Sequence, residues 1–226
     1  RKKYDKSSVS LREIRRFGLI FNFFLETYLK KIDAKTELER KDLEIKAISL
    51  SIYICYYLRL PTKILRETFV EEIMKDNNSF LEICENETKY ITNKILEGSE
   101  KKYNLAKNKA LCENIFSEFI CILLKEPLII CGKPGSSKTL SVRLLLSAMK
   151  GEKSKNEFFK QFPEVIPSFY QCSLTSTSEN LKQVFRSAQK KLEKNDYKII
   201  SLIFMDEMGI ADESDNNPLK VLHSQF

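Results

Sequence analysis

Ligands for a metal site are scarce in this sequence. There is one histidine, His223, and there are six cysteines, none of which lies in a C-x-x-C pair. A structural zinc site needs thiolate or imidazole ligands paired at short spacing, so this pattern excludes a zinc finger within the chain. Most of the cysteines lie in apolar runs, as Cys55, Cys121 and Cys131 do, which predicts small core residues in a reducing compartment.

Long apolar runs are missing as well. The stretch from Phe119 to Leu124 is interrupted by Lys125 and Glu126, whereas a membrane-spanning helix needs about 20 consecutive apolar residues. No stretch has the pattern of a signal peptide. We therefore expect no membrane span and a cytoplasmic location.

Blocks of like charge are also absent, although the net charge is +7 at pH 7. The 38 basic residues are mixed with 31 acidic ones, and no five like charges occur in a row. Such mixing is typical of solvated helix faces rather than of a polyanion-binding surface. We expect no nucleic-acid partner.

Glycine and proline are rare in the first half of the chain. Residues 1–125 hold two of the six glycines and one of the six prolines. Apolar residues recur there at helical spacing, and Ser10 with Glu13 forms a capping box. The pattern predicts helices over about 11–28, 42–60, 62–74 and 104–124, with a polar linker between the last two that holds one or two short helices. The predicted organisation is a helical region over 1–75, a linker over 76–103 and a second domain over 104–226.

The second half alternates between apolar runs and helical patterns. Strands are predicted at 127–131, 166–171 and 199–205, and helices at 138–149 and from a Ser176–Glu179 capping box to about Glu193. A β-α-β-α-β order implies a parallel sheet with helices on both faces. The fold class is therefore α/β, preceded by an all-α region.

A phosphate-binding loop is predicted between the first of these strands and its helix. Its residues are Gly132, Lys133, Pro134, Gly135, Ser136, Ser137, Lys138 and Thr139. This Walker A-type context lets backbone N–H groups and a helix N-terminus surround a phosphate. Lys138 would reach the β- and γ-phosphates of ATP, and the Thr139 hydroxyl would bind Mg2+. The alternative is a Gly-Pro-Gly turn with an incidental lysine.

Ser137 departs from the usual pattern, which has glycine before the lysine. A serine held at positive φ there would cost about 1 kcal/mol or more. We expect ATP binding to tolerate this cost, whereas the rate of hydrolysis is open.

Two acids end the last predicted strand, as in a Walker B motif. Asp206 and Glu207 follow the apolar run and so lie at the edge where open α/β sheets bind ligands. Asp206 is placed to orient Mg2+, and Glu207 to act as general base on the attacking water. The alternative is an acidic turn at a strand end. The interval from Lys138 leaves room for one intervening strand, which matches an AAA+ P-loop ATPase.

The sequence also resembles one family of AAA+ proteins. Serine at 137 and the segments 110–116, 169–173, 206–214 and 218–223 are similar to a central AAA+ unit of the mysterin family, giant RING-finger ubiquitin ligases with six AAA+ units in one chain. The resemblance covers about residues 104–223. It implies ATP and Mg2+ as cofactors, neighbouring AAA+ units and the ubiquitin machinery as partners, and zinc only elsewhere in the full-length protein.

The N-terminal segment has a possible place in this family too. Residues 9–17 look like the opening of a sensor-2 helix, so the resemblance makes Arg12 a candidate sensor of a preceding unit and residues 1–75 the lid of that unit. The alternative is an amphipathic helix with surface arginines. The chain starts at Arg1 and ends within an amphipathic segment, so we expect an incomplete large subdomain that lacks sensor 1, an arginine finger and its own lid.

Three functions stay open on the sequence. The chain is an ATPase unit of a mysterin-like ligase, an ATP-holding unit without turnover, or part of a different motor such as a dynein-like AAA+ protein. In each case we expect this piece alone to be inactive.

Overall fold

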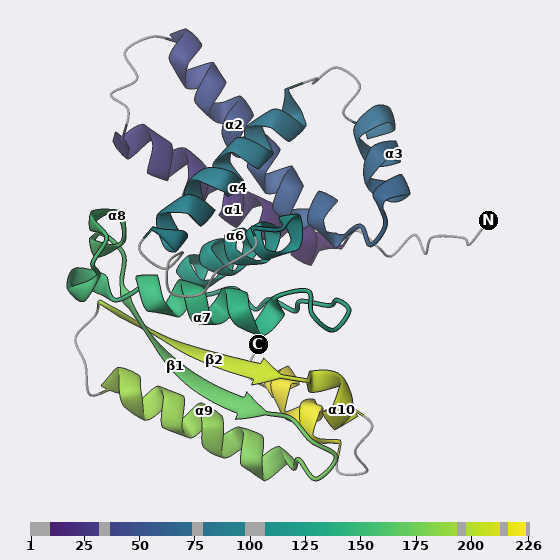
Figure 1. Ribbon diagram of the computed structural model, residues 1–226, viewed down its shortest axis with the longest axis vertical. Coiled ribbons are helices and arrows are strands. Elements are labelled where there is room, and N and C mark those ends of the chain that lie inside the picture. The colour runs from purple at the N-terminus through teal and green to yellow at the C-terminus, as the bar shows by residue number, and fades with distance from the viewer. Residues whose placement is uncertain are drawn as a thin grey trace. The chain divides into compact units, whose positions relative to one another are not determined.

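The computed structural model describes residues 10–31, 37–73, 79–97, 107–193, 198–212 and 217–224 (Figure 1). The chain divides into two compact units, residues 1–91 and 92–226. We describe each unit by itself.

The first unit is helical in its described part. It contains α1 (Leu11–Lys31), α2 (Glu37–Cys55), the short 3-10 helix η2 (Tyr57–Arg59), α3 (Lys63–Ile73) and most of α4 (Phe80–Leu96). One half of the predicted capping box is present at α1, where the Ser10 N–H donates to Glu13 Oε2 at 2.9 Å; the Ser10 hydroxyl donates to the same oxygen at 2.6 Å, and the Glu13 N–H donates to the Ser10 carbonyl. The two bonds that Ser10 donates lower the pKa of Glu13 to about 2.

Helix α4 differs from the predicted linker with short helices. It is a single 17-residue helix because a stripe of buried side chains runs along it at helical spacing. The stripe begins with Phe80, which lies against Tyr53 and Tyr57 with ring centroids 6.4 and 6.1 Å away. Its other members are Cys84, Thr88, Ile91 and Ile95. Many charged residues on the remaining faces hide this stripe in the sequence.

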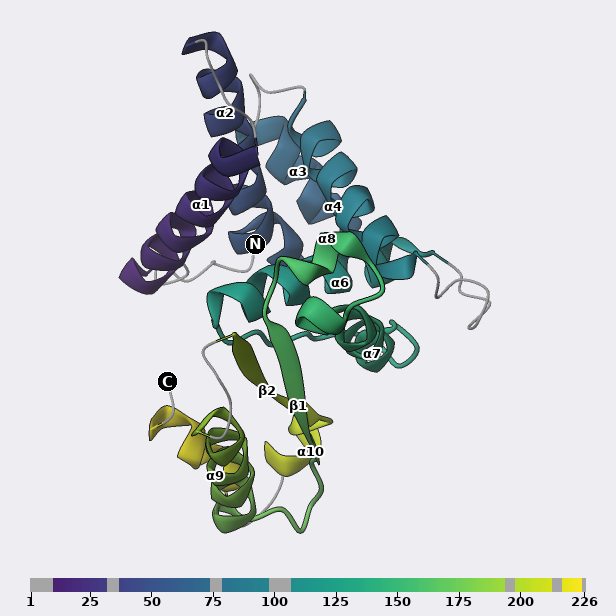
Figure 2. The same cartoon turned by 90° about the vertical axis from the view of Figure 1, so that its left-hand side faces the viewer.

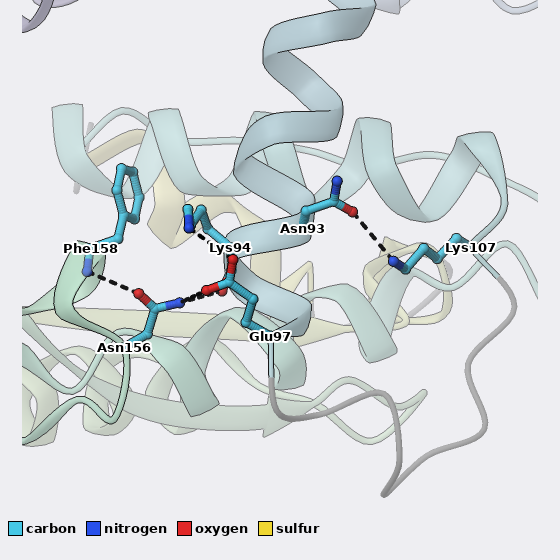
Figure 3. A network of polar contacts seen from close by, with 6 residues as sticks. All are labelled: Asn93, Lys94, Glu97, Lys107, Asn156 and Phe158. Atoms are coloured by element: carbon cyan, nitrogen blue, oxygen red, sulfur yellow. Dashed lines mark hydrogen bonds and ion pairs between the residues drawn. The ribbon is translucent and has the colours of Figure 1, made fainter.

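A network of polar side chains lies at the C-terminal end of α4, within the second unit (Figure 3). Asn156 caps the short helix α8 (Glu157–Lys160) by accepting from Phe158 N–H at 2.9 Å. Its amide group donates to the Lys94 carbonyl and to Glu97 Oε2, at 2.9 and 2.8 Å. Because the last carbonyls of a helix have no partner inside it, Asn156 satisfies one of them.

The second unit joins helices to a small parallel sheet. After α6 (Lys109–Leu124) come α7 (Lys138–Ala148), η3 (Gly151–Lys153), α8, β1 (Glu164–Gln171), α9 (Ser178–Glu193), β2 (Ile199–Asp206), α10 (Met208–Asp212) and η4 (Pro218–Ser224). The strands β1 and β2 pair in parallel, with Glu164 opposite Ile199 and Gln171 opposite Asp206. They lie between α7 and α9 (Figures 1 and 2), so helices cover both faces as predicted.

The predicted strand at 127–131 is wrong. The described sheet has two strands, β1 and β2, and they pair only with each other. A strand requires a hydrogen-bonded neighbour, and no described segment pairs with 127–131. Leu128 is 40% exposed and Ile129 is 73% exposed. Cys131, which the sequence predicts to be a core residue, is exposed too.

The cap of α9 also differs by one residue from the prediction. Thr177 and Asn180 form the capping pair, with Asn180 Oδ1 accepting from the Thr177 N–H at 3.1 Å and the Thr177 hydroxyl accepting from Asn180 N–H at 3.2 Å. Ser176 is used elsewhere, because its hydroxyl accepts from Tyr170 Oη and from Ser173 N–H in the turn after β1.

Among the described residues, none of the helices combines the length and the apolar character needed to cross a membrane.

Candidate nucleotide-binding site

The predicted loop lies at the surface and opens α7. Gly132, Lys133, Pro134 and Gly135 are exposed, and Ser136 through Thr139 are half-buried. The Lys138 ammonium donates to the carbonyls of Gly132 at 2.8 Å and Lys133 at 3.1 Å. The Lys138 side chain therefore lies across the loop and bonds to its backbone.

The backbone of the loop is left-handed at two positions. Gly135 has φ +80°, and Ser137 has φ 61° and ψ 21° immediately before the first residue of α7. This conformation costs a residue with a side chain about 1–2 kcal/mol. Ser137 therefore lies at positive φ, which is the strained case considered from the sequence, and it adopts a conformation that favours glycine. A Cβ at Gly132 would lie 2.7 Å from Ser136 Oγ, so a side chain there would require the Ser136 hydroxyl to move.

The two motifs meet through one hydrogen bond. The Thr139 hydroxyl, in the first turn of α7, donates to Asp206 Oδ2 at the end of β2 across 2.9 Å. A hydroxyl and a carboxylate are oxygen ligands that suit Mg2+, which keeps several waters and also binds the phosphates of its nucleotide. No group of three or more carboxylate, thiol or imidazole side chains that could hold a metal occurs in the described ranges, so a cation here would depend on nucleotide and water for its other ligands.

Glu207 follows directly at the end of β2. It is exposed and has φ 54°, and its backbone N–H donates to Asp206 Oδ1 at 3.0 Å. The Gln171 amide donates to Glu207 Oε2 at 2.8 Å. Sequence reasoning missed Gln171, although the ends of adjacent parallel strands meet at one edge of a sheet and so predict its position.

Helix α6 contributes two further residues that the sequence did not reveal. Asn114 Nδ2 donates to the Ser136 carbonyl at 3.0 Å. Glu118 is buried beside α7, with Oε1 2.7 Å from the Ser141 hydroxyl, which also lies 2.7 Å from the Lys138 carbonyl. Burial raises the pKa of Glu118 to about 8, and the Ser141 bond opposes this rise. The available signal was a lone acid within the apolar run 115–124.

The predicted sensor residue lies in the first unit. Arg12 is exposed in the first turn of α1. Its role toward a nucleotide stays a prediction.

Three features of this site are typical of AAA-type nucleotide-binding units. They are a loop crossed by a lysine, a carboxylate at a strand end that is hydrogen-bonded to the threonine of the helix after the loop, and a parallel β-α-β unit. Residues 104–226 match the family model for the RNF213 AAA domain. The chain belongs to this family, which confirms the resemblance seen in the sequence.

Similarity extends over nearly the whole chain. It is 31% identical to E3 ubiquitin-protein ligase RNF213 of Mus musculus over 227 residues (95% of the chain), 32% identical to rnf213-beta of Danio rerio over 221 residues (96%) and 30% identical to RNF213 of Homo sapiens over 235 residues (99%). The chain spans 4% of the length of each relative. It is thus similar to a small part of large E3 ligases.

Proposed function

We propose that this chain binds ATP with Mg2+ at Gly132–Thr139 and, within the full-length protein, supports its hydrolysis. The observation that carries the proposal is the 2.9 Å bond between Thr139 and Asp206. It joins the phosphate-binding loop to the strand-end acids, although 67 residues separate them in the chain. If the loop were an incidental turn and Asp206 an incidental acid at a strand end, nothing would favour a contact between them.

Each residue then has a defined task. The backbone N–H groups of the loop and of the start of α7 hold the phosphates, and Lys138 neutralises charge on the β- and γ-phosphates. Thr139 and Asp206 hold the Mg2+, which supplies charge neutralisation on the phosphate oxygens. Glu207 accepts a proton from the attacking water.

The place of this unit in a larger protein is proposed from its relatives. Since they are named E3 ubiquitin-protein ligases, we propose that ATP at this site regulates or drives such a ligase in the cytoplasm. Its partners would be neighbouring AAA+ units of the same chain and, through other domains, the ubiquitin machinery. Zinc would belong to those other domains.

A second candidate is an ATP-holding unit that does not turn over. One observation favours it: the Gln171 amide holds the Glu207 carboxylate at 2.8 Å. This bond affects the proposed base more directly than it affects phosphate binding.

The variant Glu207→Gln in the full-length protein separates the two candidates. It keeps the size of the side chain and removes the base, so we expect unchanged ATP binding at this site and a lower rate of phosphate release. Binding is read from ATP-dependent protection against hydrogen exchange in peptides covering 132–149. Unchanged phosphate release with intact binding would support the holding unit and remove Glu207 as the base.

A further inference from the structure

We infer that Asn114 is a positioning residue for the phosphate-binding loop, and that it holds the peptide between Ser136 and Ser137 in the orientation that phosphate binding requires. The inference rests on the proposed ATP site. It explains how a serine is kept in a conformation that otherwise favours glycine.

Helix α6 provides a firm base for this contact. The Asn108 side chain caps the helix by accepting from Leu111 N–H at 2.8 Å. Leu111 and Ile115, on either side of Asn114 in sequence, are fully buried. Asn114 itself is half-buried and makes its bond to the Ser136 carbonyl across 22 residues of chain. The donor is therefore held by the core of the unit, not by the loop.

The bond from Asn114 sets the orientation of the peptide plane between Ser136 and Ser137. The Ser136 carbonyl and the Ser137 N–H belong to one planar trans peptide, so they point in opposite directions. Rotation of this plane changes ψ of Ser136 and φ of Ser137 together. By holding the carbonyl toward α6, Asn114 keeps the Ser137 N–H turned away from α6 and keeps φ of Ser137 positive, at 61°.

This N–H is one of the donors at the start of α7. The first N–H groups of a helix have no partner within the helix, and they are the groups that bind a phosphate there. A glycine at 137 would adopt positive φ without help. With serine, a plane rotated to negative φ would remove the Ser137 N–H from the set of donors, so the bond from Asn114 favours binding of phosphate by this loop.

The test is a double-mutant cycle in the full-length protein. Apparent affinity for a non-hydrolysable ATP analogue with Mg2+ is read from protection of peptides covering 132–149 against hydrogen exchange. Asn114→Ala should weaken binding about fivefold to tenfold, as expected for loss of one hydrogen bond. Asn114→Asp should weaken it further, because an oxygen then faces the Ser136 carbonyl. In a Ser137→Gly background, Asn114→Ala should cost less than about twofold.

Asn108→Ala is the matched control. It removes the asparagine that caps the same helix, and the side-chain bond that is lost goes to Leu111 N–H of α6, not to the loop. We expect it to lower the melting temperature while affinity stays within about twofold. Exchange of peptides covering 178–193 reports whether each variant is folded.

Three results would overturn the inference. The first is wild-type affinity in Asn114→Ala. The second is an equal loss in the Ser137→Gly background, since Asn114 would then act only through packing. The third is wild-type protein without any ATP-dependent protection, which would overturn the proposed function itself and is recognised without the variants.

Discussion

At the scale of a single residue, Ser137 is the loop position where the sequence and the structure both indicate backbone strain. The sequence identifies it as a departure from glycine, and the structure gives it φ 61°. We expect Ser137→Gly to stabilise the folded chain by up to about 1 kcal/mol, since relief of the left-handed strain exceeds the added freedom of the unfolded chain. Thermal unfolding of wild type and variant measures this. A loss of 1 kcal/mol or more would contradict the account of strain at this position.

Glu118 predicts a pH dependence of stability. Its folded pKa is about 8 and the ordinary value is 4.5, so the folded state holds a proton that the unfolded state has lost between these two values. The contribution to stability is fully present below pH 4.5 and is lost as the pH rises toward 8. The slope approaches about 1.4 kcal/mol per pH unit.

The variant Glu118→Gln removes this titration. Its stability relative to wild type should therefore increase steadily from pH 5 to pH 8 in urea unfolding, since comparison at each pH cancels the other groups. A constant difference over this range would show that Glu118 titrates normally in the folded state.

At the scale of elements, the site lies where α7 begins and β2 ends. Thr139 and Asp206 contribute the two oxygen ligands proposed for Mg2+, 2.9 Å apart. We expect EDTA to weaken ATP binding by at least tenfold in wild type and by much less in Thr139→Ala, which has lost part of the cation site. Titrations with and without Mg2+ measure this difference, and an equal Mg2+ effect in both proteins would remove Thr139 from the site.

The elements that the sequence predicts well are those with a local signal. The strands at 164–171 and 199–206 and the helix from Lys138 are as expected, because apolar runs and the loop motif lie within each segment. Helix α4 was predicted only as one or two short helices within a linker, because its stripe mixes Phe80 with Cys84 and Thr88 among charged residues.

The strand expected at 127–131 could not be judged from the segment itself. An apolar run predicts a strand, but a strand also needs a neighbour, and pairing is a property of the rest of the sheet. The contacts of Asn114, Glu118 and Gln171 likewise join residues that are 22, 23 and 36 positions apart. No local pattern specifies such contacts.

At the scale of the whole molecule, the proposed function depends on one site in the second unit. The family assignment over residues 104–226 supports an AAA-type unit, and the chain covers 4% of its large relatives. If the neighbouring AAA+ units proposed above also bind ATP, total ATPase activity would combine several sites, so a measurement local to this loop is more direct.

That measurement is the ATP-dependent protection of peptides covering 132–149 against hydrogen exchange in the full-length protein. We predict protection in wild type, its loss in Lys138→Ala, and its retention in Arg143→Ala, which removes an exposed positive charge from the same helix. Protection that persists in Lys138→Ala, or that is absent in wild type, would contradict the assignment of this loop as an ATP site.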